Sequence, residues 1–500
     1  MTDPRLTLRI TNTLSGKTEK WSSPLGREVK LYVCGITAYD HCHLGHARSA
    51  IVFDVIRNYL EYRGQAVRYV KNFTDLDDKI ILRGQKEGRD WKEVAEQFIG
   101  SYERDMARLR VRPPTVAPKA TDHIPDMIRM IERLISKGMA YPMEGSVYFR
   151  VEQLPAYGAL SKQKKAEMMV GARVEVDERK SGPLDFALWK KSKPGEPEWP
   201  SPWGMGRPGW HIECSAMAIA HLGETLDLHG GGLDLIFPHH ENEIAQSEGC
   251  TGVPFSSCWI HHGFVTVHTE KMSKSLGNSL TIEALFEKSS HDEAVVAEVI
   301  RFYFLSTHYR APIDFSDGNL TMAKASLDRF YTLFQKLSKI APPPFSPSTN
   351  VFLSKELLSS EGIAFVHQFE TAMDDDFNSP RAIGLLQTFR ATVNRGLSDG
   401  SRDEEARRRM ARQALVIFEK IGVVFGLFSI PSLQWPDRSW NTTPSSEAPL
   451  DEATLEALLR EREEARRNKE WSRSDAIRDR LLKAGMTIED QSDGPSRIKR

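Results

Sequence analysis

The chain has 500 residues, of which 40% are hydrophobic and 27% are charged. This composition is typical of a globular protein and excludes a fibrous or disordered chain, and the length predicts two to four domains. The formal net charge of −1 provides no overall attraction to nucleic acid, so any contact with RNA has to use local patches.

The sequence shows no pattern of export or membrane insertion. Met1 to Ile10 have neither the apolar segment of a signal peptide nor a transit-peptide pattern, and no run of about 18 apolar residues occurs. Five cysteines in so long a chain do not predict a disulfide framework, and they favour burial or metal ligation in a reducing compartment. We therefore expect a cytoplasmic protein without membrane contact.

The first clear pattern is a strand, a loop and a helix. Glu28 to Cys34 reads as a strand, and Gly45 to Tyr62 carries apolar residues along one stripe of a helix. A second strand is predicted over Ala66 to Phe73, and helical sequence continues to Arg110. This order predicts a parallel α/β sheet with a crossover helix.

Two short basic signatures stand out on this framework. His43-Leu44-Gly45-His46 opens the predicted helix, where free N–H groups and the helix dipole favour phosphate. Its two histidines can donate to phosphate oxygens, and Gly45 lets a nucleotide approach the backbone. The second signature, Lys271-Met272-Ser273-Lys274-Ser275, places two cations in a loop. Together the signatures predict the two halves of one ATP site.

The rest of the chain is divided by changes in composition. A helix is predicted over Ile124 to Lys137 within an inserted segment, and strongly helical sequence runs from Leu353 to Phe428. Stretches rich in proline, at 341–347 and 431–449, read as linkers. The domain boundaries expected are 1–118 and 203–265 for the two halves of the first domain, 119–202 for an insertion, 266–340 for the loop of the second signature and the region after it, 350–430 for a helical bundle, and 450–500 for a C-terminal domain.

A third group of residues has the chemistry of a metal site. Cys34 ends the first strand, Cys214 lies far along the chain, and His239 and Glu243 are four residues apart and would share one face of a helix. Two thiolates, an imidazole and a carboxylate suit zinc. The spacing leaves further candidate ligands open, namely His240, Glu241, Cys42, Cys250 and Cys258.

The two basic signatures resemble the HIGH and KMSKS signatures of class I aminoacyl-tRNA synthetases. More specifically, Tyr32 to Arg48, Pro183 to Met217 and His229 to Glu248 are similar to cysteinyl-tRNA synthetases, as are Ala372 to Asn378 and Ala465 to Asp490. The similarity covers nearly the whole chain. It implies an α/β fold with a Rossmann-like parallel-sheet catalytic domain and an inserted subdomain, followed by a helical bundle that binds tRNA and a small C-terminal anticodon-binding domain.

The resemblance also implies roles for single residues. The metal ligands implied are Cys34, Cys214, His239 and Glu243. The amino-acid pocket implied consists of Thr74, Trp210 and His229. The residues expected to act on ATP are His43, His46, Lys271 and Lys274, and Gly230 to Gly232 with Asp234 are expected to approach the adenosine. The alternative for these glycines is a plain turn.

The activity implied is the attachment of L-cysteine to tRNA(Cys) through a cysteinyl-adenylate, with ATP and Mg²⁺ as substrate and one Zn²⁺ per monomeric chain. The substrate thiol ionises more readily than the hydroxyl of serine and is a better soft ligand. A metal could therefore exceed the roughly 10–200-fold discrimination that shape provides between analogues differing by one methylene. A separate editing domain is not expected.

Three other functions fit part of the pattern: a cysteine ligase of mycothiol synthesis, a small-molecule nucleotidyltransferase, and an inactive RNA-binding or zinc-binding module. The charged helical pair at 455–482 favours the tRNA enzyme over the first, with Arg466, Arg467, Lys469, Arg473 and Arg478 available for phosphate. The tail departs from the family pattern, because no Trp precedes the terminal Arg497-Ile498-Lys499-Arg500. We expect an arginine, or a residue elsewhere, to replace its stacking on an anticodon base.

Overall fold

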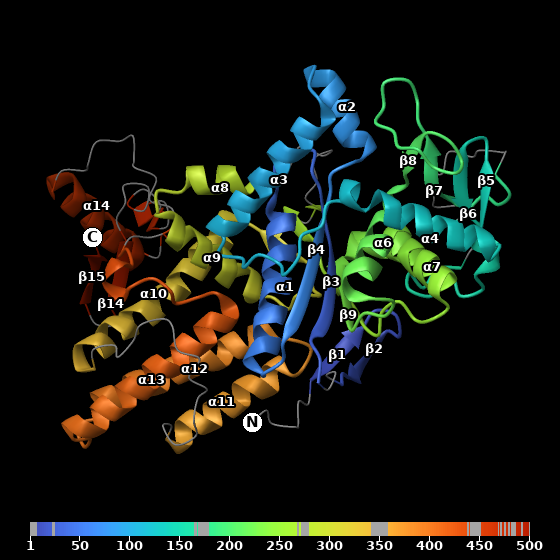
Figure 1. Cartoon of the computed structure of the whole chain (residues 1–500). Helices are drawn as coiled ribbons and strands as arrows, with labels where there is room; N and C mark the ends of the chain where they lie inside the picture. Colours follow the sequence, from blue (N-terminus) through green and yellow to red (C-terminus); the bar gives the residue numbers. More distant parts are fainter. Residues whose placement is uncertain are drawn as a thin grey trace.

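The computed structural model describes residues 8–22, 26–164, 168, 180–267, 270–271, 280–341, 359–437 and 440, and parts of 452–499. No helix within these ranges is long and apolar enough to cross a membrane. Figure 1 shows the order of the elements, with the sheet near the middle of the molecule and the helical region on one side of it.

A parallel four-stranded sheet forms the centre, in the order β10-β9-β3-β4. The bounds are Val29–Thr37 for β3, Val67–Thr74 for β4, Leu228–Gly232 for β9 and Trp259–His262 for β10. Alternate residues of β3 enter different cores: Leu31 and Val33 pack with α1 (Leu44–Tyr62), and Tyr32 and Cys34 pack with α6 (Trp210–Leu222). Both faces of the sheet are therefore covered, as parallel sheets require.

The predicted first strand is longer than expected. It continues past Cys34 to Thr37, with a shift of register against β4 between Val33 and Ile36. Gly35 lies at this irregularity, where a Cβ atom would come within 1.5 Å of the Asn72 carbonyl oxygen. Only glycine fits, and the bulge turns the end of the strand toward the site.

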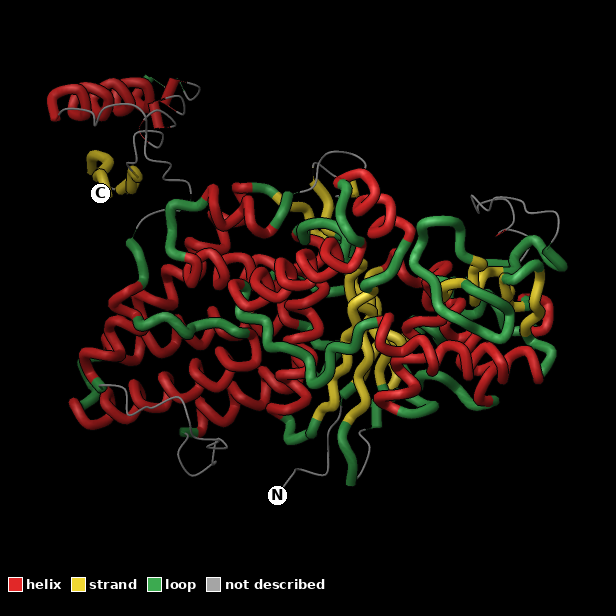
Figure 2. The backbone as a smooth tube through the Cα atoms, turned by 45° about the horizontal axis from the view of Figure 1, so that its top comes forward, coloured by secondary structure: helices red, strands yellow, loops and turns green. Residues whose placement is uncertain are grey.

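The segment between β4 and β9 contains helices and a separate antiparallel sheet in the order β5-β6-β7-β8. The helices are α2 (Asp78–Glu87), α3 (Trp91–Arg108), α4 (Ile124–Ser136) and α6. The strands are β5 (Ala140–Met143), β6 (Ser146–Phe149), β7 (Phe186–Lys191) and β8 (Gly206–Pro208). This sheet lies at the opposite side of the molecule from the helical region (Figures 1 and 2).

A small sheet follows the central one, in the order β12-β11-β13. Its strands are β11 (Val265–Val267), β12 (Glu270–Lys271) and β13 (Ile313–Phe315). The helices of this region are α7 (Glu241–Thr251), which precedes it, and then α8 (Ile282–Lys288), α9 (Glu293–Leu305) and α10 (Asp317–Ile340).

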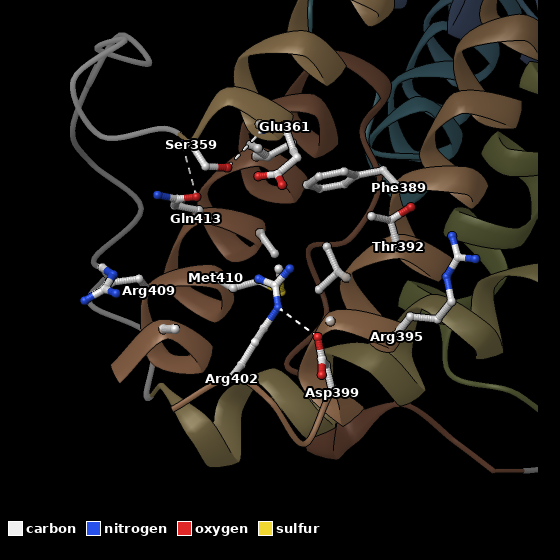
Figure 3. Close-up of a pocket in the computed structure, with 16 residues that line it drawn as sticks. Ser359, Glu361, Phe389, Thr392, Arg395, Asp399, Arg402, Arg409, Met410 and Gln413 are labelled. Atoms are coloured by element: carbon white, nitrogen blue, oxygen red, sulfur yellow. Dashed lines mark hydrogen bonds and ion pairs between the residues drawn. The ribbon is translucent and has the colours of Figure 1, made fainter. Parts of the chain in front are cut away.

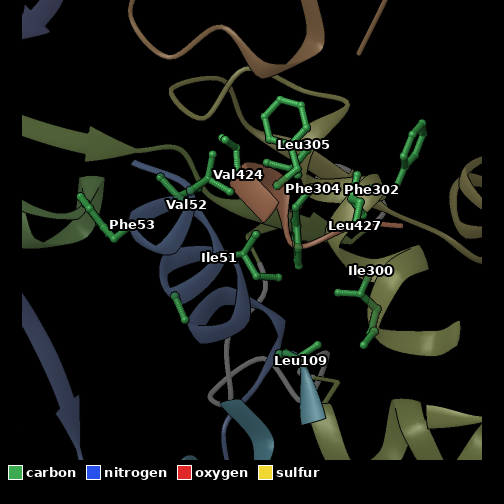
Figure 4. Close-up of a cluster of buried hydrophobic side chains, with 14 of the residues drawn as sticks. Ile51, Val52, Phe53, Leu109, Ile300, Phe302, Phe304, Leu305, Val424 and Leu427 are labelled. Atoms are coloured by element: carbon green, nitrogen blue, oxygen red, sulfur yellow. The ribbon is translucent and has the colours of Figure 1, made fainter. Parts of the chain in front are cut away.

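The predicted bundle consists of α11 (Ser360–Met373), α12 (Ser379–Ser398) and α13 (Glu404–Phe425), packed with α10. It shares one hydrophobic core with the central sheet. Figure 4 shows Ile51 and Val52 of α1 beside Phe304 of α9 and Val424 of α13, all from one buried cluster. The bundle is thus fixed directly to the helix that carries the first signature.

The acidic run at Asp374 to Asp376 makes polar contacts across the same interface. Asp374 accepts hydrogen bonds from the Tyr59 hydroxyl and from Arg63, each of 2.6 Å. Asp376 accepts from the backbone of Thr11 at 3.0 Å, and also from Tyr309 and Arg310. These aspartates therefore dock the bundle onto the region of the central sheet.

Two hairpins complete the described structure, one near each end of the chain. Strands β1 (Arg9–Asn12) and β2 (Lys17–Lys20) pair near the N-terminus. At the other end, α14 (Glu452–Arg467) matches the first of the predicted pair of helices. The antiparallel pair of β14 (Thr487–Gln491) and β15 (Gly494–Lys499) after it was not predicted from the sequence.

Candidate active site

The first signature forms the N-terminal cap of α1. The Nδ1 atom of His43 accepts a hydrogen bond of 3.0 Å from the Gly45 N–H, and Nδ1 of His46 accepts one of 3.2 Å from the His43 N–H. The two rings are stacked with centroids 4.0 Å apart. Because Nδ1 is an acceptor in both rings, a neutral imidazole carries its proton on Nε2. Both histidines are thus held in the tautomer that can donate to phosphate.

Gly45 has a role that the sequence did not reveal. A Cβ atom there would lie 2.8 Å from Cε1 and 2.9 Å from Nδ1 of His43. These contacts are too short for real side chains, so the absence of a side chain at Gly45 is what allows His43 to fold back over the helix terminus.

The second signature begins at the edge of the small sheet. Lys271 is the last residue of β12, which pairs with β11, while Lys274 lies outside the described residues. The chain after the signature returns to the first one, since the Leu44 N–H donates to Leu280 and the Ile282 N–H donates to Cys42. The described structure therefore brings the segment following the second signature against the loop of the first.

A cluster of four buried side chains lies on the face of the central sheet that α6 covers, opposite α1. Cys34, Cys214, His239 and Glu243 each offer one ligand atom, and these atoms lie within 4.8 Å of one another. The Cys34 thiol donates to Glu243 Oε1 at 3.1 Å, and Nε2 of His239 is 3.0 Å from the same oxygen. The helix α7 and the residues just before it place His239 and Glu243 on one face, as predicted.

The local backbone explains how distant residues meet here. Cys34 lies at the bulge of β3, Cys214 lies in the first half of α6, and Glu243 lies in the first turn of α7. His239 lies in an irregular helical turn, Ile236–His240, which contains the cis peptide bond before Pro238. The sequence spacing alone could not predict that these four elements converge.

A second set of neighbouring ligand atoms shares two of these residues. Cys34 and Glu243 also lie within 4.8 Å of ligand atoms of His229 and His240. His240 Nδ1 is 2.8 Å from His261 Nε2, and His261 in turn is 2.8 Å from Thr13, while His240 Nε2 lies 3.9 Å from Glu243 Oε1. We infer that His240 belongs to a hydrogen-bonded chain beneath the cluster.

Glu241 and the cysteines at 42, 250 and 258, which the spacing also allowed as ligands, enter neither set within the described part of the chain. Glu241 instead accepts hydrogen bonds of 2.8 Å from the backbone of Gly158 and of Ser161. It thereby holds a loop of the insertion against α7. The three cysteines are buried elsewhere.

The electrostatics of the cluster favour a bound cation. A hydrogen bond with Cys34 lowers the pKa of the Cys214 thiol to about 6, whereas burial raises the pKa of Cys34 well above its usual value. Burial works against ionisation of Glu243, but the imidazoles of His229 and His239 hold its pKa well below the ordinary range. Two thiols, an imidazole and a carboxylate are the donor set that zinc prefers, so these residues fit that ion.

Of the three residues expected in the amino-acid pocket, Trp210 and His229 contact this cluster. Thr74 is linked to it through Asn72, whose amide donates to the Thr74 hydroxyl and accepts from Cys214. Thr74 ends β4 and is 3% exposed. Trp210 begins α6, is 36% exposed, and stacks on His239 with a centroid distance of 4.3 Å. His229 is fully buried, and its Nε2 lies 2.9 Å from Glu243 Oε2. Trp210 is the one of the three with substantial exposure, so it forms the open side of this group.

The glycine run lies in β9, so the alternative of a plain turn is wrong for Gly230 to Gly232. A Cβ atom on Gly230 would meet Phe53 at 2.2 Å, and one on Gly231 would meet His240 at 2.7 Å. At Gly232 it would lie 2.4 Å from an Asp234 carboxylate oxygen. The first two glycines therefore make room for buried rings, and the contact with adenosine stays a prediction.

A groove of about 580 Å³ lies away from these residues, between α11, α12 and α13. Figure 3 shows Arg402 paired with Asp399 at one side of it and Gln413 bonded to Ser359 at the other. Neither signature and none of the potential metal ligands line this groove. It is therefore distinct from the candidate active site.

Comparison with known proteins agrees with this geometry. Residues 22–325 match the family of tRNA synthetases class I (C) catalytic domain, residues 368–429 match the DALR domain, and residues 450–495 match the cysteinyl-tRNA ligase anticodon binding domain.

Similar proteins of known name match over nearly their whole length. The cysteine–tRNA ligase of Thermodesulfovibrio yellowstonii is 48% identical over 97% of this chain and 98% of its own. The cysteine–tRNA ligase of Geobacter sulfurreducens is 49% identical over 98% of this chain and 99% of its own. Among solved structures, the methionyl-tRNA synthetase of Mycobacterium tuberculosis bound by methionyl-adenylate has a TM-score of 0.58 at 17% identity. The match covers 79% of this chain and 92% of that one. At this identity the likeness shows the fold alone. The chain belongs to the cysteine–tRNA ligase family of class I tRNA synthetases.

Proposed function

We propose that the protein attaches L-cysteine to tRNA(Cys) in two steps, through a cysteinyl-adenylate. The observation that carries this proposal is the buried set of Cys34, Cys214, His239 and Glu243. It lies across the sheet from the N-terminus of α1, whose two histidines can donate hydrogen bonds to phosphate. In a class I fold, these two features supply selection of a thiol and activation by ATP.

Cys34, Cys214, His239 and Glu243 would hold one zinc ion. When bound, zinc supplies a soft Lewis acid that coordinates the substrate thiolate and discriminates against the hydroxyl of serine. Trp210 closes the open side of the cluster and keeps water from it, and Thr74 and His229 position the rest of the amino acid. The buried carboxylate of Glu243 keeps His229 and His239 in place.

In the first step, a carboxylate oxygen of cysteine attacks the α-phosphorus of ATP, and the bond to pyrophosphate breaks. The Nε2–H groups of His43 and His46 donate to the phosphates, and Lys271 and Lys274 neutralise charge on the leaving pyrophosphate, which Mg²⁺ accompanies. Gly232 and Asp234 contact the adenosine from the end of β9. In the second step, a ribose hydroxyl of tRNA attacks the adenylate carbonyl and AMP leaves.

We also propose that the domains follow the boundaries expected from the sequence, with the acceptor end of tRNA at the central sheet, the bundle at 350–430 along its body, and 450–500 at the anticodon. The match of the C-terminal residues to an anticodon binding domain supports tRNA, rather than an amino sugar, as the acceptor. We expect a monomer, and light scattering of the purified protein tests this.

The test of the function is ATP–pyrophosphate exchange with each of the twenty amino acids, together with charging of tRNA. We expect exchange with cysteine and charging of tRNA(Cys). Exchange without charging would indicate a small-molecule cysteine ligase, and absence of exchange would refute the adenylate mechanism.

A further inference from the structure

Asn72 has a buried amide side chain that lies between the metal cluster and the amino-acid pocket. It belongs to β4 and is 1% exposed. Alternate residues of a strand face the same side of a sheet, and Val70, two residues earlier, packs in the same core as Cys34 and Cys214. Asn72 therefore faces the side of the central sheet that α6 covers, as the metal cluster does.

The orientation of this amide is fixed by the neighbouring strand. The N–H of Gly35, at the bulge of β3, donates a hydrogen bond of 2.9 Å to Asn72 Oδ1. A backbone N–H can only donate, so the amide oxygen has to face Gly35 and the NH₂ group has to face away from it. The amide is thus held in one orientation beside the bulge, next to the metal ligand Cys34.

Each end of the amide meets a residue of the proposed site. The NH₂ group donates to Thr74 Oγ1 at 3.4 Å, and Oδ1 lies 3.7 Å from Cys214 Sγ, which donates to it. The oxygen and the nitrogen of an amide are about 2.2 Å apart, so the Cys214 sulfur and the Thr74 hydroxyl are at most about 9 Å apart. One rigid group therefore links the metal-binding end of the pocket to Thr74 at the end of β4.

Coordination of a thiol leaves one discrimination unsolved. A metal separates cysteine from serine because it distinguishes sulfur from oxygen. Homocysteine carries the same thiol on a side chain that is one methylene longer, so a metal does not reject it by its chemistry. The methylene adds about 1.3 Å between the thiol and the carboxylate, and a misplacement of about 1 Å can lower a reaction rate by about 100-fold. Rejection of homocysteine therefore requires a fixed distance between the two ends of the pocket.

We propose that Asn72 is a positioning residue that sets this distance and thereby selects cysteine against homocysteine. This inference rests on the proposed function, in which the thiol binds beside Cys214 and Thr74 positions the rest of the amino acid. With both ends held by one amide, a substrate with an extra methylene reaches Thr74 only with its carboxylate displaced from the α-phosphorus of ATP. The link resists stretching, because breaking either hydrogen bond of the amide leaves a buried polar group without a partner.

The test measures ATP–pyrophosphate exchange with L-cysteine, L-homocysteine and L-serine in the unmodified protein and in Asn72→Ala. We expect the ratio of kcat/KM for cysteine to that for homocysteine to fall by at least about tenfold in the variant, because the two ends of the pocket are no longer held at one distance. The ratio for cysteine to serine should not change. The zinc content by mass spectrometry should stay at one per chain, because all four potential ligands are present.

A matched control is Val70→Ala, two residues earlier on the same face of β4. Val70 is fully buried, so its truncation removes packing atoms from the same core but no hydrogen bond of the site. It should lower the temperature of thermal unfolding and leave both ratios unchanged. A fall of the ratio for homocysteine in this control, equal to that in Asn72→Ala, would overturn the proposal, because loss of packing alone would then explain the effect.

Thr74→Val tests the other end of the link, because valine has the shape of threonine without the hydroxyl that accepts from Asn72. This variant should also lower the ratio for cysteine to homocysteine and leave the ratio for cysteine to serine unchanged. The double variant, Asn72→Ala with Thr74→Val, should lose no more selectivity than the larger of the two single variants, since both break the same link. Additive losses would overturn the proposal, because they would show that Asn72 does not act through Thr74.

A purely structural role of Asn72 gives a different result. Equal falls of both ratios with loss of zinc would overturn the proposal, because they would show that the amide only supports the metal cluster. If Asn72→Ala does not fold, Thr74→Val decides, and an unchanged ratio for homocysteine in that variant would overturn the proposal. Lack of cysteine-dependent exchange in the unmodified protein would remove the proposed function and this inference together. Exchange with cysteine and an unchanged ratio for homocysteine in Asn72→Ala would remove only the inference.

Discussion

The buried arginine of α9 offers a quantitative test of how the bundle is joined to the central sheet. Arg301 is 0% exposed and pairs with Asp54 of α1, which is 1% exposed. It also donates to the carbonyl oxygen of Phe425 at 2.9 Å and to those of Leu109 and Arg110 at 3.2 Å. Arg301→Met would leave the carboxylate of Asp54 buried without its cation, together with three carbonyl groups.

Removing one partner of a buried ion pair costs about 3–5 kcal/mol of unfolding free energy. We expect Arg301→Met to fall in this range, as measured by urea unfolding followed by far-ultraviolet circular dichroism. Replacing both partners with apolar residues, in Asp54→Leu combined with Arg301→Met, should recover more than half of the loss because no charge stays buried. A loss below about 1 kcal/mol in the single variant, or a double variant as unstable as the sum of the two singles, would refute the reasoning.

Two further predictions concern the carboxyl group of Asp105 and the glycine of the first signature. Burial raises the pKa of Asp105 to about 6 from 3.8, although Arg108 opposes the change. The folded state therefore holds the proton of this carboxyl group more tightly than the unfolded state does. The contribution of protonated Asp105 to stability is present at acid pH and is lost as the pH rises through about 6. Asp105→Asn should therefore stabilise the protein at about pH 7.5 by at most about 3 kcal/mol and have little effect at about pH 4, and a gain that does not change with pH in urea unfolding would contradict this. Gly45→Ala should displace His43 from its cap, lowering the unfolding free energy by about 1 kcal/mol and lowering the exchange rate. The control Gly100→Ala, whose Cβ would approach Arg104 no closer than 3.4 Å, should be neutral or stabilising. Equal effects of the two variants on exchange would show that the cap has no role in activity.

The sequence predicted the local elements of the catalytic region well, because each has a strong periodic pattern. The helix expected from Gly45 to Tyr62 begins one residue earlier, at Leu44, and the second strand is shifted by one residue at each end. The strand expected to end at Cys34 continues to Thr37, because the bulge at Gly35 interrupts the alternation of the side chains without ending the pairing. The hairpin of β14 and β15 has a mainly polar sequence, which gave no strand signal.

The site was harder to predict from local patterns, because it depends on which strands become neighbours. Spacing alone could not choose between His239 and His240, and the resemblance to a known family was needed for that choice. The order β10-β9-β3 explains why His229 and His261 lie beneath the cluster, although neither is near Cys34 in the sequence. The His240–His261 chain was missed, and the sequence signal for it was a pair of histidines within an apolar strand, Trp259–His262.

The proposed function depends on a metal held by Cys34, Cys214, His239 and Glu243, which selects cysteine. The measurement that tests it most directly is the ratio of exchange rates with cysteine and with serine, together with the zinc content by mass spectrometry, in the unmodified protein and in Cys34→Ser. We expect one zinc per chain and a strong preference for cysteine in the unmodified protein, and loss of zinc with a weakened preference in the variant. Zinc retained at one per chain in Cys34→Ser, with an unchanged preference for cysteine, would show that Cys34 neither binds the metal nor takes part in the selection.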